Sequence, residues 1–277
     1  MTTARIDARF AELKTEGRAA FVAYVMGGDP DLATSLKILK GLPAAGADVI
    51  ELGFPFSDPI GEGPTIQRAA QRSLAAGTKL DDILGLARAF READQTTPLI
   101  LMGYLNVVVN RGEAAFARDI VAAGIDGVII VDCPPEEAGP LADALDAVQV
   151  SLLNLFTPTS DDARLQTIAK RTSGFAYYVS VAGVTGVKEA DEQVVAPAVA
   201  RVRKASRLPV AVGFGIKTPE RAAAIARVAD AVVVGSVLVE EIADGASRNE
   251  DVTLRVLSKA EALAKAVRGA RIAQPAV

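Results

Sequence analysis

The chain has 277 residues, of which 50% are hydrophobic and 23% charged, a composition that provides for a large core and excludes wholesale disorder. Its net charge is −4 and no basic block stands out, which argues against nucleic acid as a partner. The single cysteine, Cys133, and the lack of histidine exclude an internal disulfide, Cys- or His-based metal sites and imidazole catalysis, leaving acid–base chemistry to Asp, Glu, Tyr or Lys.

The hydrophobic pattern predicts eight short apolar strands, each followed by helix. The strands are expected at 21–26, 49–52, 99–102, 127–131, 150–156, 174–181, 209–212 and 231–234. Helices are expected at 5–15, 31–42, 64–75, 80–92, 113–123, 136–147, from a cap at Ser160, at 194–205, from a cap at Thr218 to 228, and at 252–267.

The strands are rich in Val, Ile and Leu instead of alternating with polar residues, as expected where helices cover a parallel sheet. Eight repeated βα units predict a single-domain (β/α)8 TIM barrel over residues 1–277, with an extra N-terminal helix and a loose tail at 268–277. The alternative is an open doubly wound sheet. That fold usually has a G-x-G-x-x-G motif after its first strand, and the turn at 27–30 lacks it.

One carboxylate, Glu51, lies inside the apolar run Val49–Leu52, and the long loop that follows is rich in Gly and Pro and carries Asp58 and Glu62. An acid within a buried strand costs several kcal/mol unless it is paired, hydrogen-bonded or protonated. We therefore expect Glu51 to be the centre of an active site at the C-terminal ends of the strands. The alternative is a structural carboxylate held by a helix N-terminus or a threonine.

Glycine-rich turns follow the sixth, seventh and eighth predicted strands, and barrels often bind phosphate at the last two such turns with a short helix. A short helix is expected over 235–242. The predicted phosphate site comprises Gly186, Gly215, Gly235 and Ser236; ordinary strand-to-helix turns are the alternative. Among the other strand-end residues, Asp29 and Asp132 are interpreted as turn or cap residues, and Lys217 as a surface residue.

Several motifs, taken together and in chain order, resemble the tryptophan synthase α subunit family. The most specific is the run from Glu51 to Pro59 followed by that from Gly63 to Gln67. The supporting matches are 28–30, Tyr104 with Asn106, 182–186, 213–216 and 235–236. They span nearly the whole chain, and their combination is far more specific than any single motif.

The resemblance implies a carbon–carbon lyase of L-tryptophan biosynthesis that cleaves indole-3-glycerol phosphate to indole and glyceraldehyde 3-phosphate. It implies no cofactor in this chain. It also implies a β subunit as partner in an α2β2 heterotetramer, to whose pyridoxal phosphate site the indole passes through a tunnel. The N-terminal segment lacks the apolar core of a signal peptide, and no apolar run is long enough to span a bilayer, so we expect a cytoplasmic protein.

The resemblance also implies roles for individual residues. Glu51 would protonate the indole ring carbon and take a proton from the adjacent glycerol hydroxyl, and Glu62 would stabilise charge at the ring nitrogen. Thr185 would reach across to the loop after the second strand, and Asp58 would contact the β subunit or anchor its own loop. Substrate-binding residues would be Tyr24, Tyr104, Leu155, Tyr177, Thr185 and Phe214.

The sequence departs from the family pattern in the loop that carries the second acid. Gly61-Glu62-Gly63-Pro64 stands where the family usually has Ala-Asp-Gly-Pro. The extra methylene of Glu62 moves its carboxylate by about 1 Å, a displacement that can cost on the order of a hundredfold in rate. Our hypothesis is that Gly61 lets the loop retract and compensate. Val181 is a second departure, because some family members have arginine there.

Two other functions stay open on the sequence alone. The chain could be an allosteric partner that activates the β subunit while Glu62 impairs its own cleavage. It could also be another phosphate-binding barrel, such as a sugar-phosphate isomerase or epimerase. Those enzymes commonly use an Asp pair, a metal-binding His set or a catalytic Cys, so the lack of histidine argues against this class.

Overall fold

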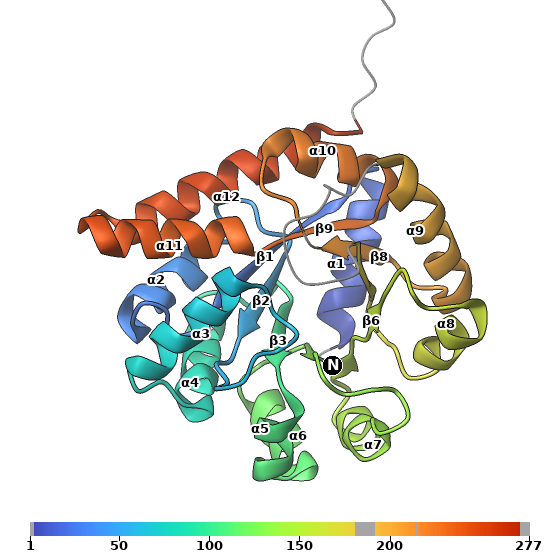
Figure 1. Cartoon of the computed structure of the whole chain (residues 1–277), viewed down its shortest axis with the longest axis horizontal. Coiled ribbons are helices and arrows are strands. Elements are labelled where there is room, and N and C mark those ends of the chain that lie inside the picture. The colour runs from blue at the N-terminus through green and yellow to red at the C-terminus, as the bar shows by residue number, and fades with distance from the viewer. Residues whose placement is uncertain (1–2, 181–191, 214, 272–277) are drawn as a thin grey trace, which may run out of the picture.

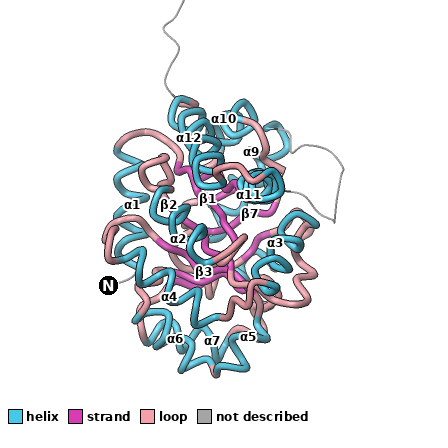
Figure 2. Tube along the Cα trace, turned by 90° about the vertical axis from the view of Figure 1, so that its left-hand side faces the viewer, coloured by secondary structure: helices cyan, strands magenta, loops and turns pink. Residues whose placement is uncertain are grey.

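The computed structural model describes residues 3–180, 192–213 and 215–271, which form a barrel of parallel strands inside a ring of helices (Figures 1 and 2). The strands are β1 (Ala20–Met26), β2 (Val49–Gly53), β3 (Leu99–Gly103), β4 (Gly127–Ile130), β5 (Ser151–Leu152), β6 (Leu155–Phe156), β7 (Ala176–Val179), β8 (Val210–Gly213) and β9 (Ala231–Val234). Every strand pair is parallel, in the order β5-β4-β3-β2-β1-β9-β8-β7-β6.

Twelve helices surround these strands within the described residues. They are α1 (Thr3–Thr15), α2 (Leu32–Gly41), α3 (Pro64–Ala75), α4 (Leu80–Arg91), α5 (Leu105–Arg111), α6 (Glu113–Ala122), α7 (Gly139–Ala147), α8 (Asp162–Ala169), α9 (Glu192–Ser206), α10 (Pro219–Val228), α11 (Ser236–Arg248) and α12 (Val252–Gly269). In the part of the chain that the structure describes, no helix has both the length and the apolar character needed to cross a membrane.

The predicted fifth strand is divided into β5 and β6, and this division closes the barrel. β5 pairs with β4, whereas β6 pairs with β7. Between them, the Leu153 N–H donates to the Val128 carbonyl at 2.9 Å, and the Asn154 carbonyl accepts from the Tyr177 N–H at 3.3 Å. The two pieces therefore occupy one strand position, and the expected (β/α)8 barrel is confirmed, with nine strand segments in eight positions.

The buried apolar residues form two groups because successive strand side chains face opposite sides of the sheet. Residues such as Ile50 and Leu52 pack outward against the helices. Residues such as Val22, Val49 and Ile129 fill the barrel interior. The N-terminal helix α1 adds three apolar side chains to the interior group, so it covers the N-terminal ends of the strands: Ile6, Phe10 and Leu13.

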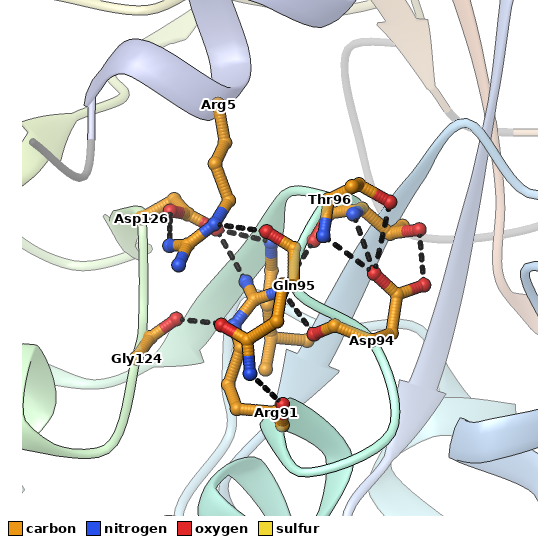
Figure 3. Close-up of polar contacts among 9 residues, drawn as sticks. Arg5, Arg91, Asp94, Gln95, Thr96, Gly124 and Asp126 are labelled. Atoms are coloured by element: carbon orange, nitrogen blue, oxygen red, sulfur yellow. Dashed lines mark hydrogen bonds and ion pairs between the residues drawn. The ribbon is translucent and has the colours of Figure 1, made fainter.

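Aspartates placed just before strands hold that end of the barrel together. Each of three aspartates makes two hydrogen bonds to one residue of a neighbouring strand: Asp48, Asp126 and Asp230. The aspartate N–H donates to that residue's carbonyl, and the aspartate carboxylate accepts that residue's N–H. Each also binds arginine, and Asp126 is fully buried while Arg5 and Arg91 converge on it at 2.7 and 2.5 Å (Figure 3). The Arg5 contact ties α1 to the barrel.

Some element predictions were wrong in detail. α5 was not predicted; the Asp132 carboxylate accepts the Leu105 N–H at 2.7 Å and caps this helix. Asp161, and not Ser160, caps α8, since its carboxylate is the group that accepts the Arg164 N–H.

The last two predicted elements are longer than expected. α11 extends to Arg248, beyond the short helix predicted at 235–242. α12 reaches Gly269, and the Arg271 side chain donates to the carbonyl groups of Ala226 and Ala229, so the first residues of the expected tail are tied to α10. Residues 272–277 lie outside the described residues.

The burial of Asp126 predicts a stability difference between two aspartates in equivalent places. Asp126→Asn should lower the free energy of unfolding by about 3 kcal/mol, because Arg91 stays buried without a charged partner. Asp230→Asn should cost less than about 1 kcal/mol, because the Asp230 side chain is 30% exposed. Urea unfolding of both variants checks this, and equal losses would show that burial of the pair does not matter.

Candidate active site

Glu51 lies on the interior face of β2, beside β1 and β3. Its register partners are Tyr24 and Ile100, and both belong to the interior group of side chains. Glu51 is completely buried, and among the described residues neither of its carboxylate oxygens has a hydrogen-bond partner. The threonine or helix N-terminus expected for a purely structural carboxylate is therefore not found among those residues.

Burial raises the pKa of Glu51 to about 8, and repulsion from the charge of Glu62 adds to the effect. Glu62, in the loop before α3, is 9% exposed, and burial raises its pKa to about 7. Two carboxyl groups thus share one dry region at the C-terminal ends of the strands. Acids with pKa values near neutrality can both release and accept protons at working pH, which is the requirement for general acid–base chemistry.

Three tyrosines surround the two glutamates. Tyr24 and Tyr177 are buried, and desolvation together with the charges of Glu51 and Glu62 raises their pKa values well above the usual range. Tyr104 is also buried, and burial with the Glu62 charge raises its pKa. These phenols therefore stay protonated and available as hydrogen-bond donors. Half-buried Leu155 packs against the same interior group.

The glycines at two strand ends make room for these rings. A side-chain Cβ at Gly53 would lie 2.4 Å from the Tyr24 hydroxyl oxygen, and one at Gly213 would lie 2.3 Å from that of Tyr177. A Cβ at Gly235 would lie 3.1 Å from the Tyr24 ring. Tyr24 therefore reaches from the turn after β9 to the end of the strand that carries Glu51.

Two of the predicted phosphate-site residues, Gly235 and Ser236, lie at the start of α11. Gly235 is the N-cap residue, without a side-chain cap, and Ser236 begins the helix. The first N–H groups of a helix have no partner within it and attract anions. Gly215 has a φ of +74°, a conformation suited to glycine. Three predicted site residues lie outside the described residues: Thr185, Gly186 and Phe214. Val181 lies outside them too.

The remaining strand-end residues have mainly structural contacts. Asp29 lies in the turn after β1, as interpreted, where its N–H donates to the Met26 carbonyl at 3.4 Å; its side chain is fully buried and accepts two hydrogen bonds from Arg72, at 2.8 and 2.7 Å. Lys217 is exposed, as predicted, and binds Glu240. Asp58 is exposed and accepts a hydrogen bond from Ser57. Sequence reasoning gave no role to Gln67, although it ends the Gly63–Gln67 run of the family motif; its side-chain amide donates to the Glu62 carbonyl at 2.9 Å.

The fold makes this chain a (β/α)8-barrel protein. Its buried pair of carboxyl groups lies at the C-terminal ends of the strands, where such barrels have their active sites. The family profile described as "Tryptophan synthase alpha chain" matches residues 10–268. The chain is 72% identical to the tryptophan synthase alpha chain of Phenylobacterium zucineum, over 100% of both chains. It is 67% identical to that of Caulobacter vibrioides, over 98% of this chain and 99% of the relative.

Solved structures agree with this result. Tryptophan synthase subunit alpha from Legionella pneumophila superimposes with a TM-score of 0.89 at 37% identity, over 95% of this chain and 98% of that one. A chain of Mycobacterium tuberculosis tryptophan synthase superimposes with a TM-score of 0.86 at 35% identity, over 95% of this chain and 98% of that one. The chain therefore belongs to the tryptophan synthase alpha chain family. This confirms the family assigned from the sequence, and it makes the protein an enzyme of tryptophan biosynthesis.

The raised pKa of Glu51 predicts how stability depends on pH. The folded-state pKa is about 8 against an ordinary value of 4.5, so the folded protein favours the neutral acid. The neutral acid's contribution to the free energy of unfolding is fully present below about pH 4.5. It is lost as the pH rises to about 8, by up to about 1.4 kcal/mol per pH unit. Glu51→Gln should therefore gain stability relative to the wild type between pH 5 and 8. Urea unfolding across this range measures it, and parallel curves for the two proteins would contradict it.

Proposed function

We propose that this chain is the lyase component of tryptophan synthase and cleaves indole-3-glycerol phosphate by a retro-aldol reaction. The observation that carries the proposal is the pair of buried carboxyl groups, Glu51 and Glu62, at the C-terminal ends of the barrel strands. Family membership supports it, since the reaction is the one that the sequence motifs imply.

In the proposed reaction, the Glu51 carboxylic acid gives its proton to the indole ring carbon that carries the glycerol chain. The Glu51 carboxylate then takes the proton of the adjacent glycerol hydroxyl. The hydroxyl oxygen forms a carbonyl, the carbon–carbon bond breaks, and its electron pair returns to the ring. Indole and glyceraldehyde 3-phosphate leave, and Glu51 regains its proton. A pKa of about 8 suits both steps, because neither protonation state is costly to reach.

In the same proposal, Glu62 stabilises the positive charge that develops at the ring nitrogen when the ring carbon is protonated. Charge repulsion by Glu62 contributes to the raised pKa of Glu51, so the longer side chain brings its carboxylate close to the same region. Substrate contacts come from Tyr24, Tyr104, Leu155, Tyr177, Thr185 and Phe214, and the phosphate is held by Gly186, Gly215, Gly235 and Ser236.

We further propose that the indole passes to a β subunit in an α2β2 complex, and that pyridoxal phosphate is bound only by that partner. The exposed rim of the site supports a docking partner: Ile60 is 79% exposed and lies two residues beyond Asp58, which is exposed as well. Asp58 contacts the β subunit or anchors its loop. We propose as well that the chain folds as a single domain, is located in the cytoplasm and binds no cofactor itself.

Glu51→Gln should lower indole release by on the order of a thousandfold, because the amide can neither give nor take the proton. The measurement is indole production from indole-3-glycerol phosphate, with and without a β subunit. Exposed Glu92→Gln is the matched control and should have wild-type activity. A Glu51→Gln protein that releases indole at the wild-type rate would contradict the proposal.

The same assay separates the regulatory alternative, which the extra methylene of Glu62 favours. Stimulation of the β subunit by wild-type protein that releases no indole itself would support a purely allosteric role. Indole release only in the presence of the β subunit would support coupled catalysis.

Glu62→Asp should lower the cleavage rate by on the order of a hundredfold, because the loop is arranged for the longer side chain and the shorter one withdraws the carboxylate by about 1 Å. Exposed Glu137→Asp serves as the control. A sharp gain in rate for Glu62→Asp would refute the hypothesis that the loop already compensates for glutamate.

A further inference from the structure

The backbone around Glu62 is fixed by three hydrogen bonds. The Gly61 N–H donates to the Tyr104 hydroxyl at 3.1 Å, and the Glu62 N–H donates to the Pro59 carbonyl at 3.0 Å. The Gln67 side-chain amide donates to the Glu62 carbonyl at 2.9 Å. The loop is therefore attached on one side to the residue that follows β3 and on the other side to α3.

Gly61 allows the loop to lie unusually close to the ends of β3 and β4. A side-chain Cβ at Gly61 would lie 2.6 Å from Val131 Cγ1 and 3.3 Å from the Tyr104 hydroxyl oxygen. The first distance is shorter than real Cβ contacts allow, and the β-branched valine has little rotamer freedom with which to move away. Any other residue at position 61 would push the loop outward.

The helix that carries Gln67 is held firmly at its other end. Arg72 of α3 donates two hydrogen bonds to buried Asp29, and the Ser73 hydroxyl donates to the Gly27 carbonyl at 2.7 Å. The Tyr104 ring is buried directly after β3, and it also stacks on Phe56 at the beginning of the same loop, with ring centroids 5.3 Å apart. Both attachments of the loop therefore lead to groups with fixed positions.

We propose that Gln67 and Gly61 are positioning residues for Glu62: the Gln67 amide and the missing side chain at Gly61 fix the depth at which the Glu62 carboxylate enters the site. This inference rests on the proposed catalytic role of Glu62. Displacement of a catalytic carboxylate by about 1 Å costs on the order of a hundredfold in rate, so small shifts of this loop have large effects.

The direct test replaces Gln67 with methionine, which has a similar length and helix propensity but cannot donate a hydrogen bond. Gln67→Met should lower kcat by about tenfold and change KM less than twofold, because Glu62 acts on charge that develops in the transition state. Gln71→Met is the matched control, since Gln71 is exposed one turn further along the same helix, and it should leave both constants unchanged.

Two further readouts separate positioning from a general structural role. In the Glu62→Gln background, Gln67→Met should lower kcat less than twofold, because the carboxylate that it positions is gone. Comparison of Glu62→Gln with the wild type identifies the limb of the pH–rate profile that depends on Glu62. In the Gln67→Met single variant, this limb should lie at lower pH than in the wild type. An equal loss in both backgrounds with an unchanged profile would overturn the positioning role. If Glu62→Gln alone has full activity, the catalytic role of Glu62 fails, and the inference fails with it.

The Gly61 contact has its own test. Gly61→Ala should lower kcat by about tenfold, and the double variant Gly61→Ala/Val131→Ala should recover most of that loss, because the second change removes the Cγ1 atom that the new side chain would strike. Val131→Ala alone should stay within about twofold of the wild type. Failure of the double variant to recover activity, with the single variants folded by circular dichroism, would overturn the steric part of the proposal.

Discussion

The site depends on one constraint, the removal of the Glu51 carboxyl group from water. The group projects from an apolar strand into the interior of the closed barrel, and none of the described residues gives it a hydrogen bond. Desolvation therefore favours the neutral acid and raises its pKa to about 8. Glu62 adds negative charge nearby, and Tyr24, Tyr104 and Tyr177 keep their protons for the same reason. In the function that we propose, this unfavourable burial is what makes one side chain both an acid and a base near neutral pH.

The two ends of the barrel use carboxylates in opposite ways. At the N-terminal ends of the strands, Asp48 and Asp126 accept backbone N–H groups and pair with arginines, so their charges are compensated. At the other end, Glu51 has no such partner among the described residues. The paired end stabilises the barrel, which can therefore tolerate an uncompensated acid at the end where the chemistry is proposed. Asp29 and Asp132 are exceptions at this end, because Asp29 pairs with Arg72 of α3 and Asp132 accepts the Leu105 N–H.

The sequence predicted the barrel and Glu51 because both depend on local pattern. The apolar runs marked the strands, and a lone acid in one of them marked a buried carboxyl group and the candidate site. The role expected of Glu62 came only from the resemblance to a family, because neither periodicity nor spacing could have assigned it. The division of β5 from β6 was not predictable, since Val150 to Phe156 has a continuous strand pattern. The contacts of Gly61, Gln67 and Asp29 were not predictable either, because each depends on a partner that only the closed barrel brings near.

The central claim is that Glu51 is desolvated and holds its proton near neutral pH. It can be measured by 13C NMR of protein labelled at the glutamate side-chain carboxyl carbons, titrated from pH 4 to 9. The Glu51 signal is assigned by its absence from the Glu51→Gln spectrum. Our account predicts a Glu51 pKa far above the ordinary value of 4.5, near 8. A Glu51 signal that titrates below pH 5, together with the exposed glutamates, would contradict it.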